Sequence, residues 1–355
     1  MATKLDISEL DFQGIKENLK TFLSQQDEFR DYDFQGSGMN ILLDVLAYNT
    51  HYLGYNANML ANEMYLDSAS QRSSVVSLAK QVGYTPRSAT SSKATIDVTV
   101  NNASGSSITM SRGTKFTSTV DGTAYNFVNN ADVSISPVDG VYKFSNLEVF
   151  EGTFLNFKYT VNTADTEQRF VIPNDDVDTT TLTVKIQESA TDTTTNTYTL
   201  ASGITGLDST SKVYFLQEVE NGRFEVYFGD GVLGKAVADG NIVILDYITC
   251  NRDAPNGAST FTLSGNVGGF TNVTISTIGN AAGGDSPETI KSIKYNAPRD
   301  YTSQDRAVTA DDYKVLVKSL YANAQSVQVY GGEDAAVPDY GKVYISIRAK
   351  SGSNL

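Results

Sequence analysis

The sequence predicts an α+β, multidomain protein with an N-terminal helical segment, β-rich middle domains and a small α/β C-terminal domain. Apolar residues recur at three- and four-residue steps up to about residue 85, and from Ser91 they alternate with polar residues. Short strand-like runs then follow one another, separated by turns rich in Asn, Gly, Asp and Pro. A chain of 355 residues is long enough for about two to four domains, each with its own core.

Residues 1–90 are predicted to form a helical domain that contacts partners or joins a helical bundle. Gly36 and Gly38 mark the approach to a long helix, and a second helix is expected from Arg72 to Gln81, where Gly83 ends it. One apolar stripe is predicted along the long helix, and its residues are Met39, Leu42, Leu43, Leu46, Leu53, Ala57, Leu60 and Met64.

Two β-rich domains are predicted, over 91–210 and 211–285. In the first, "KATIDVTV" and "TLTVKIQ" alternate apolar and polar residues, as half-buried strands do. In the second, strands are expected at "KVYFLQEV", "RFEVYFGD" and "NIVILDYITC", with Cys250 as a small, partly buried residue in the last of them. The segment from Gly279 to Ile290 is predicted to be a flexible, Gly-rich boundary.

Residues 286–355 are predicted to form a small α/β part. Thr309 is a favourable N-cap, and Asp312 stands three positions later, where its carboxylate can reach back. Two alternating strands follow this helix, and the second has only one obvious strand nearby to pair with. We therefore expect the full-length protein to continue beyond Leu355.

Charge and composition argue against several functions. The net charge of −14 and the lack of any basic run disfavour binding to nucleic acid or to an anionic membrane surface. A single cysteine cannot form an intramolecular disulfide or a thiolate metal site. The N-terminus has no apolar core of signal-peptide length, so we expect the protein to be made and kept in a cytoplasm.

The stretch from Val226 to Tyr247 resembles a phosphate-binding loop. It has Gly229, four further residues, Gly234 and Lys235, but Ala236 stands where a Ser or Thr would hold Mg²⁺. The following residues indicate a turn and a β-branched strand, whereas phosphate binding needs a helix N-terminus. A tight hairpin at "GDG" is the favoured interpretation.

No catalytic or metal-binding residues are predicted, and no cofactor. His51 is the single histidine and no nucleophile-elbow pattern accompanies it, so helix-surface packing is favoured over base catalysis. The adjacent pairs Asp175 and Asp176, and Asp311 and Asp312, are explained by a turn and by a helix N-terminus. Spaced calcium-loop acids are also missing from the sequence.

Tyrosines on or beside the long helix favour a protein interface, although ordinary amphipathic packing is almost as good an explanation. A charge at Leu46 or Leu53 is expected to weaken assembly or folding, because the apolar stripe must be buried somewhere. The interface candidates are Leu42, Leu46, Tyr48, Tyr52, Leu53 and Leu60.

Two stretches in this order resemble the baseplate J-like family, the wedge proteins of contractile phage tails and related injection machines. The first is Val226 to Ser259, a strand ending in "FGDG" followed by an "ADG" turn and a strand ending in Tyr247. The second is Ala297 to Val317, which contains the helix start "RAVTADDY". The residues that match the family's motifs, expected to be structural, are Phe228, Gly229, Asp230, Gly231, Gly234, Arg306, Val308, Thr309, Asp312 and Tyr313.

The N-terminal helices look like the start of the large baseplate wedge subunit of contractile-tail bacteriophages (myophages), whose members are considerably longer. The resemblance implies a non-enzymatic virion protein of the tail baseplate, assembled in the host cytoplasm. Its copies would pair within each of six wedges and close a ring around the tail hub, transmitting the change that triggers sheath contraction. Its partners would be other wedge subunits and a small sheath-initiator protein.

Two other functions stay open on the sequence alone. A β-rich adhesin or carbohydrate-binding tail component would fit the abundance of Thr, Asn and Tyr and the serial strands. An NTPase built on Gly229 to Lys235 is the least favoured, for the reasons given above.

Overall fold

The computed structural model describes residues 11–26, 36–201, 203, 206–303, 306–321, 324–335 and 337–349. The chain divides into two compact units, with the boundary between Gln81 and Val82, and each unit is described by itself. Among the described residues, no helix is both long and apolar enough to cross a lipid bilayer.

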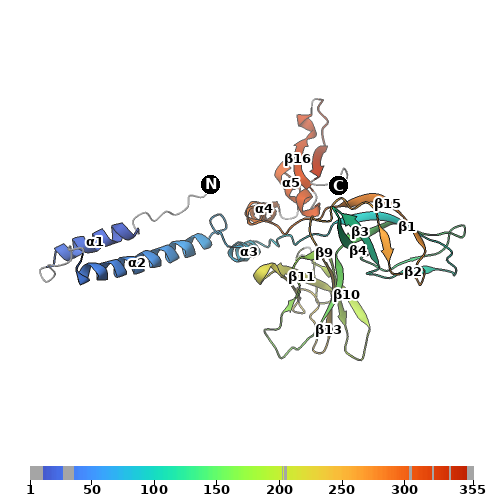
Figure 1. Cartoon of the computed structure of the whole chain (residues 1–355), viewed down its shortest axis with the longest axis horizontal. Helices are drawn as coiled ribbons and strands as arrows, with labels where there is room; N and C mark the ends of the chain where they lie inside the picture. The colour runs from blue at the N-terminus through green and yellow to red at the C-terminus, as the bar shows by residue number, and fades with distance from the viewer. Residues whose placement is uncertain are drawn as a thin grey trace. The chain divides into compact units, whose positions relative to one another are not determined.

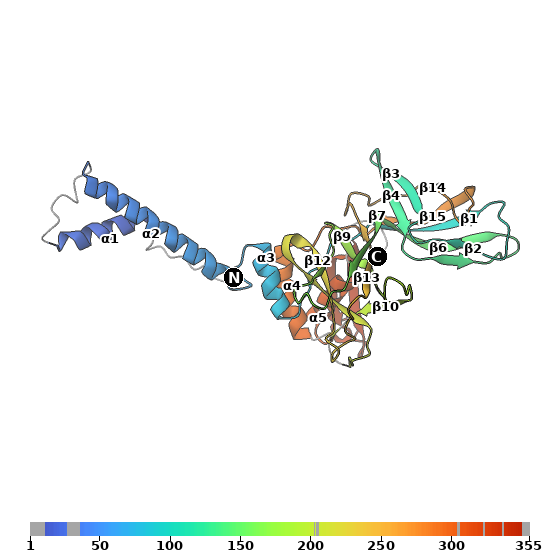
Figure 2. The same ribbon diagram turned by 90° about the horizontal axis from the view of Figure 1, so that it is seen from below.

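The described residues of the first unit form three helices, and the two longer ones lie side by side (Figures 1 and 2). Asp11 accepts a hydrogen bond from the Gly14 amide at 2.8 Å and caps the first helix, and Ser37 caps the second in the same way. The short third helix covers the range predicted for it. The bounds are α1 Phe12–Ser24, α2 Gly38–Glu63 and α3 Arg72–Gln81.

The helix α1 covers one face of α2. Ile15 of α1 and Leu43 and Ala47 of α2 are buried between them. Lys16 and Asp44 form an ion pair at 2.5 Å beside this contact. This contact uses only one side of α2.

The second unit is built on two sheets with separate cores. The first sheet has six strands in the order β14-β3-β4-β6-β1-β15, and every pairing within it is antiparallel. Its core includes Ile96, Phe116, Phe127 and Phe144, which are fully or almost fully buried. The strand bounds are β1 Lys93–Val100, β3 Lys115–Val120, β4 Thr123–Asn129, β6 Tyr142–Glu151, β14 Thr262–Ser264 and β15 Val273–Ala282.

The second sheet has seven strands in the order β7-β13-β9-β10-β11-β12-β8. Its pairs are antiparallel except for a short parallel contact between β10 and β11. Ile172, Val184, Leu245 and Tyr247 lie in its core. The strand bounds are β7 Thr153–Thr160, β8 Phe170–Val171, β9 Val177–Gln187, β10 Thr195–Leu200, β11 Val213–Glu218, β12 Phe224–Phe228 and β13 Ile242–Thr249.

The sheets do not follow the predicted boundary between residues 210 and 211, because the second sheet takes strands from both sides of it. The whole second sheet, 153–249, is inserted between β6 and β14 of the first.

The chain passes between the sheets at 151–153 and again at 249–251, and these two segments are in contact. Glu151 is fully buried and accepts hydrogen bonds from the backbone and side-chain amides of Asn251, at 2.9 and 2.7 Å.

A buried charge cluster joins the two sheets, and a separate clamp ties the start of the unit to the segment that follows β15. Arg112, which precedes β3 of the first sheet, reaches Asp246 on β13 at 3.2 Å, and Lys185 on β9 reaches the same carboxylate at 3.2 Å. In the clamp, Glu288 accepts a hydrogen bond from the Tyr84 hydroxyl at 2.8 Å, and Arg87 pairs with Asp285. These contacts tie the start of the unit to residues far along the chain.

The C-terminal part contains two helices and a strand pair. The helix α4, Ile290–Ser303, was not predicted, because Pro298 lies inside it and favours a break. The helix α5, Ala310–Leu320, and the strands β16, Ala324–Gly331, and β17, Val343–Ala349, agree with the predicted elements. A further pair joins β2, Ile108–Met110, to β5, Val133–Ile135.

The predicted Gly-rich boundary at Gly279 to Ile290 is wrong in its first part. The strand β15 continues to Ala282, and this residue pairs with Lys93 on β1. The glycines that follow are also placed by hydrogen bonds, since Gly284 and Asn256 exchange two of them at 3.0 and 2.9 Å. An added Cβ at Gly284 would overlap the Arg252 carbonyl oxygen, so this position requires glycine.

Candidate assembly interface

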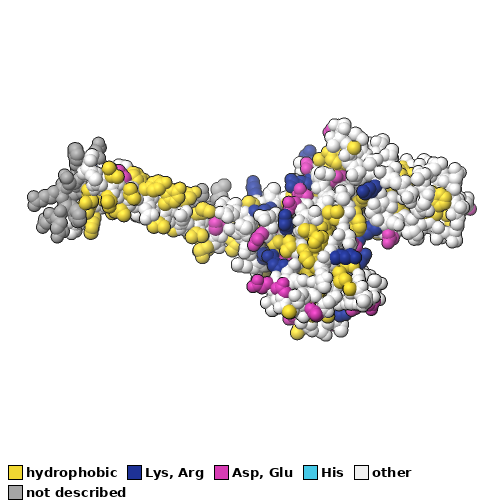
Figure 3. All heavy atoms as spheres, turned by 60° about the horizontal axis from the view of Figure 1, so that its bottom comes forward, with side chains coloured by type: hydrophobic (Ala, Val, Ile, Leu, Met, Phe, Trp, Pro, Cys, Tyr) yellow, Lys and Arg dark blue, Asp and Glu magenta, His cyan; other side chains and the backbone are white. Residues whose placement is uncertain are grey.

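The six interface candidates all lie on α2 and all are exposed. Leu42, Leu53 and Leu60 leave 57%, 61% and 69% of their surface accessible, and Leu46, Tyr48 and Tyr52 are comparably open. Figure 3 shows hydrophobic side chains in a band along α2, with few charged side chains among them. A contiguous apolar band of this length on a surface is typical of a binding site for another protein.

The structure corrects the prediction of a single apolar stripe along this helix. Leu43 belongs to the side covered by α1, whereas Leu42 and Leu46, next to it in the periodicity, face away from α1 and stay open. The helix therefore has an inner stripe that holds the unit together and a wider outer face without a partner among the described residues. Other exposed apolar residues of this outer face, missed by the sequence analysis, are Ile41, Val45, Tyr55 and Met59.

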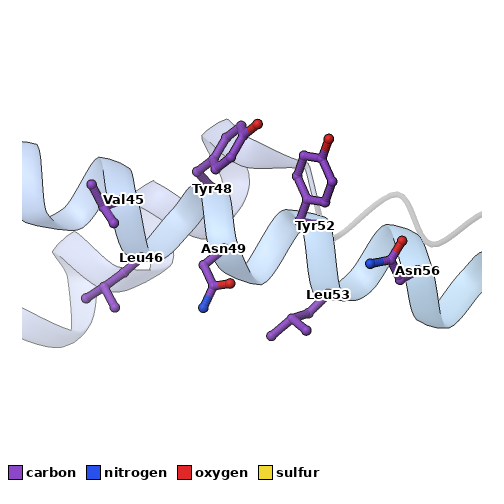
Figure 4. A pocket seen from close by; sticks show the side chains of 7 residues that line it. All are labelled: Val45, Leu46, Tyr48, Asn49, Tyr52, Leu53 and Asn56. Atoms are coloured by element: carbon purple, nitrogen blue, oxygen red, sulfur yellow. The ribbon is translucent and has the colours of Figure 1, made fainter.

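A shallow groove runs along this outer face (Figure 4). Tyr48 and Tyr52 stand together on one side, with ring centroids 5.2 Å apart, and Leu46 and Leu53 lie on the other. The Coulomb interaction and hydrogen bond with Tyr52 raise the pKa of Tyr48. The seven residues that line the groove all come from α2: Val45, Leu46, Tyr48, Asn49, Tyr52, Leu53 and Asn56.

The turn between α2 and α3 is held by one carboxylate. Glu63 accepts hydrogen bonds from the Ser70 amide at 2.7 Å, the Ser70 hydroxyl at 2.6 Å and the Gln71 amide. Burial acts to raise the pKa of Glu63, but these hydrogen bonds outweigh it and lower the pKa to about 2. The end of the exposed helix is thus anchored by an ionised side chain.

The "GDG" segment is a turn but not the predicted hairpin. The strand β12, which ends at Phe228, pairs with β11 and β8, and β13 pairs with β7 and β9. Residues 229–241 form a loop in which the Asp230 carboxylate accepts hydrogen bonds from the Val232 and Leu233 amides, at 2.9 and 3.0 Å. A side chain at Gly229 would overlap the Leu233 carbonyl, so this position requires glycine.

This loop is unsuited to phosphate. The amides that a phosphate would need are already used, because Gly234 donates to the Asp208 carbonyl and Lys235 to the Ser211 carbonyl. No helix occurs within 229–241, all of which the structure describes. Phe228, at the start of the loop, packs edge-on against Phe170 and Tyr198 in the second core.

The second family motif builds the start of α5. Thr309 and Asp312 form a complete capping box, in which Asp312 also accepts a hydrogen bond from the Val308 amide. The backbone hydrogen bond from Thr309 is the first cause of the lowered pKa of Asp312. Tyr313 begins the helical hydrogen bonds and Arg306 precedes the cap. Thr309 and Asp312 thus cap this helix, and a structural role for the other motif residues stays a prediction.

The remaining chemically active residues are used structurally or stand apart. Asp175 pairs with Arg223 and Asp176 with Arg252, so the adjacent acids do not face each other across a cleft. His51 is partly exposed on α2. Cys250 follows β13 and is buried, and burial raises the pKa of its thiol to about 12. No cluster of metal-binding side chains occurs within the residues that the structure describes.

Three family models match successive parts of the chain. A model described as "Baseplate wedge protein gp6-like, helical domain" matches residues 11–84. A model of the "Bacteriophage baseplate wedge protein gp6, third domain" matches 157–257, and one of the "Baseplate structural protein gp6, C-terminal domain I" matches 309–355. These models carry the gp6 name, and the J-like name stays a prediction.

The phage T4 relative agrees with these matches. Baseplate wedge protein gp6 of Enterobacteria phage T4 is 30% identical over 369 residues, covering 96% of this chain and 54% of the relative. The chain thus spans about half the length of that relative. A chain of the anti-feeding prophage (AFP) baseplate is 12% identical with a TM-score of 0.29, covering 88% of this chain and 57% of that one. A similarity at that TM-score supports no conclusion about the fold.

The helical unit, the second sheet and the C-terminal part each match a separate gp6 domain, in the order of the sequence. Together with the identity to the phage T4 protein, these matches show that the chain belongs to the gp6-like family of baseplate wedge proteins of contractile-tail phages.

Proposed function

We propose that the protein is a non-enzymatic, structural subunit of a phage tail baseplate wedge, and that the outer face of α2 is a surface on which it assembles. Copies would pair within each wedge and six wedges would close a ring around the tail hub. Other wedge subunits and a small sheath-initiator protein would be its partners. The ring would pass on the rearrangement that triggers sheath contraction, in the virion after assembly in the host cytoplasm.

The main support for this proposal is the exposed apolar face of α2. Ten large side chains, each about half exposed or more, present on the order of 1,000 Å² of mostly apolar surface, comparable with the ~800 Å² that each partner buries in a standard interface. They are Ile41, Leu42, Val45, Leu46, Tyr48, Tyr52, Leu53, Tyr55, Met59 and Leu60.

The rest of the molecule supports a mechanical role. Its buried carboxylates are used in joints: Glu151 ties the two passages between the sheets, and Asp246 and Glu288 tie distant segments of the same unit. Joints of this kind keep a β-rich body rigid while it moves as a whole, which is how rigid-body transitions transmit force.

The test is native mass spectrometry of the chain, alone and co-expressed with the other tail proteins, for wild type and Leu53→Glu. Burying Leu53 contributes about 1.5–3 kcal/mol, so its loss is expected to weaken assembly by roughly 10- to 100-fold, more if the charge is buried. Because Leu53 is exposed in the single chain, its thermal midpoint should barely change.

Thr50→Glu is the matched control, because Thr50 lies on α2 outside the groove and bonds its own helix backbone. This variant should assemble like wild type. A chain that enters no tail subcomplex, or a Leu53→Glu chain that assembles normally, would contradict the proposal. Saturable binding of one glycan on an array would instead favour the adhesin function.

A further inference from the structure

Asparagine is followed by glycine at two places in the chain, and the fold holds the two pairs differently. The pairs are Asn221–Gly222 and Asn256–Gly257. An Asn-Gly pair can react with itself, because the glycine nitrogen can reach the side-chain carbonyl carbon of the asparagine and close a five-membered ring. Glycine permits this approach, since it has no Cβ and leaves the backbone the most freedom.

The first pair lies in the exposed connection between β11 and β12. Asn221 and Gly222 are both exposed, and Asn221 has φ 60° and ψ 21°. Among the residues that the structure describes, neither the Asn221 side-chain amide nor the Gly222 backbone N–H has a hydrogen-bond partner. The bond across this turn, from the Arg223 amide to the Glu220 carbonyl, is long at 3.3 Å. The two reacting groups are therefore free to move.

The second pair is held by hydrogen bonds on both of its reacting groups. The Asn256 side-chain oxygen accepts from the Gly284 amide at 3.0 Å and from the Ser92 hydroxyl at 2.7 Å. The nitrogen of the same side chain donates to the Gly284 carbonyl at 2.9 Å. The Gly257 amide donates to the Ala281 carbonyl at 2.7 Å, so the atom that would attack is also engaged.

We propose that Asn221 is a site of spontaneous deamidation, and that the fold protects Asn256 from the same reaction. The modification needs no enzyme, and its co-reactant is water. The inference is independent of the proposed assembly role, because it concerns a turn of the second sheet and requires no partner protein.

The reaction has two steps, and the backbone of the turn supplies the nucleophile. The Gly222 nitrogen gives up its proton to solvent and attacks the side-chain carbonyl carbon of Asn221, and the new C–N bond closes a succinimide ring. The bond from that carbon to the side-chain nitrogen breaks, and the nitrogen takes up a proton and leaves as ammonia. Water then adds to a ring carbonyl and opens the ring. Opening at the side-chain carbonyl gives aspartate, and opening at the backbone carbonyl gives isoaspartate.

The turn has to rotate before the ring can close. At ψ 21° the Gly222 nitrogen points away from the Asn221 side chain, so the peptide between the two residues must turn. The positive φ of Asn221 is a conformation that residues with a side chain adopt at a cost, and leaving it releases this strain. An exposed turn of this kind opens locally without unfolding of the sheet.

The product changes the charge and the backbone of the turn. Each conversion replaces a neutral amide by a carboxylate, which adds one negative charge to a chain whose net charge is −14. Isoaspartate also adds one carbon to the backbone between β11 and β12. The strands beside the turn stay paired, because β11 is held by β10 and β12 by β8 on their other sides. The modification is therefore confined to the turn.

The test is incubation of the folded full chain in mildly alkaline water that carries a heavy oxygen isotope, followed by digestion and peptide mass spectrometry. Asn221 should become a mixture of aspartate and isoaspartate with one heavy oxygen, which distinguishes it from deamidation during later handling. Four hydrogen bonds must open before Asn256 can react, so its conversion should be at least about 100-fold slower.

The same chain unfolded in urea is the matched control. Both pairs are then free of tertiary contacts and should convert at similar rates, which assigns the difference in the folded chain to the structure. Asn221→Gln should stay unmodified at residue 221 in the folded chain, because its longer side chain would have to close a less favourable six-membered ring.

Two results would overturn the inference. One is a folded chain in which Asn221 stays intact while the unfolded chain converts. The other is a folded chain in which Asn256 converts as fast as Asn221, because the hydrogen bonds around Asn256 would then give no protection. Neither result affects the proposed wedge role, which native mass spectrometry of Leu53→Glu tests separately.

Discussion

Replacing Gly152 with alanine is expected to destabilise the β-rich unit by about 4 kcal/mol, because two separate penalties meet at this residue. Gly152 lies where the chain passes from β6 to β7, with φ +130°, a conformation that residues with a side chain rarely adopt. An added Cβ would overlap the Thr249 carbonyl oxygen and would lie 2.7 Å from Cγ2 of Ile248.

The magnitude follows from these two terms and has a matched control. The backbone conformation costs about 1–3 kcal/mol, and overpacking against a fixed carbonyl and a buried isoleucine costs about 1–3 kcal/mol more. Gly122 also has positive φ, +82°, but a Cβ there would meet nothing within 4 Å. Gly122→Ala therefore isolates the backbone term and should cost about 1–2 kcal/mol.

Differential scanning calorimetry of the full chain measures both variants. For a unit of this size each kcal/mol shifts the midpoint by about 2 °C, so Gly152→Ala should lower it by about 8 °C and Gly122→Ala by no more than about 4 °C. Equal shifts of the two midpoints would refute the reasoning, because they would mean that Thr249 and Ile248 move away from the added Cβ without any loss of free energy. The second passage between the sheets would then not be packed against the first as described.

Two further predictions concern charged groups. Asp246→Ala should lower the free energy of unfolding by about 3 kcal/mol, because it leaves the half-buried Arg112 without its carboxylate partner. Asp175→Ala removes one side of an exposed ion pair and should cost less than about 1 kcal/mol. Urea unfolding measures both variants, and similar losses would contradict this prediction. The Glu63 carboxyl should titrate near pH 2 in NMR, and Ser70→Ala should raise the midpoint of this titration. The stabilisation that the ionised Glu63 gives the folded chain is present above the pKa of the unfolded state and is lost as the pH falls towards 2. A wild-type midpoint near pH 4 would disprove this prediction.

Local structure could be predicted wherever neighbouring residues decide it. The helix from Arg72 to Gln81, the capping box of Thr309 and Asp312, and the alternating strands are confirmed, because caps and periodicity act within a few residues. The unpredicted helix α4 shows the limit of such rules, since its packing tolerates Pro298 inside it.

The "GDG" loop shows what local rules leave out. Glycine was expected there for a tight turn, and close approach to the Leu233 carbonyl indeed requires it at Gly229. The hairpin was wrong because β12 finds its partners in β11 and β8, whose positions depend on the rest of the sheet. Pairing of distant strands cannot be read from a turn.

By itself, the sequence determined the family, the helical start, the β-rich middle and the absence of a recognisable catalytic pattern, since motifs and periodicity are carried by nearby residues. Only the tertiary structure decided that 153–249 is inserted into the first sheet, and that Glu151 and Gly152 form the joint. It also decided which side of α2 is covered. The sequence alone does not distinguish Leu42 from Leu43, because both are apolar residues of the same helix. The position of α1 buries Leu43 in the core and leaves Leu42 exposed for a partner.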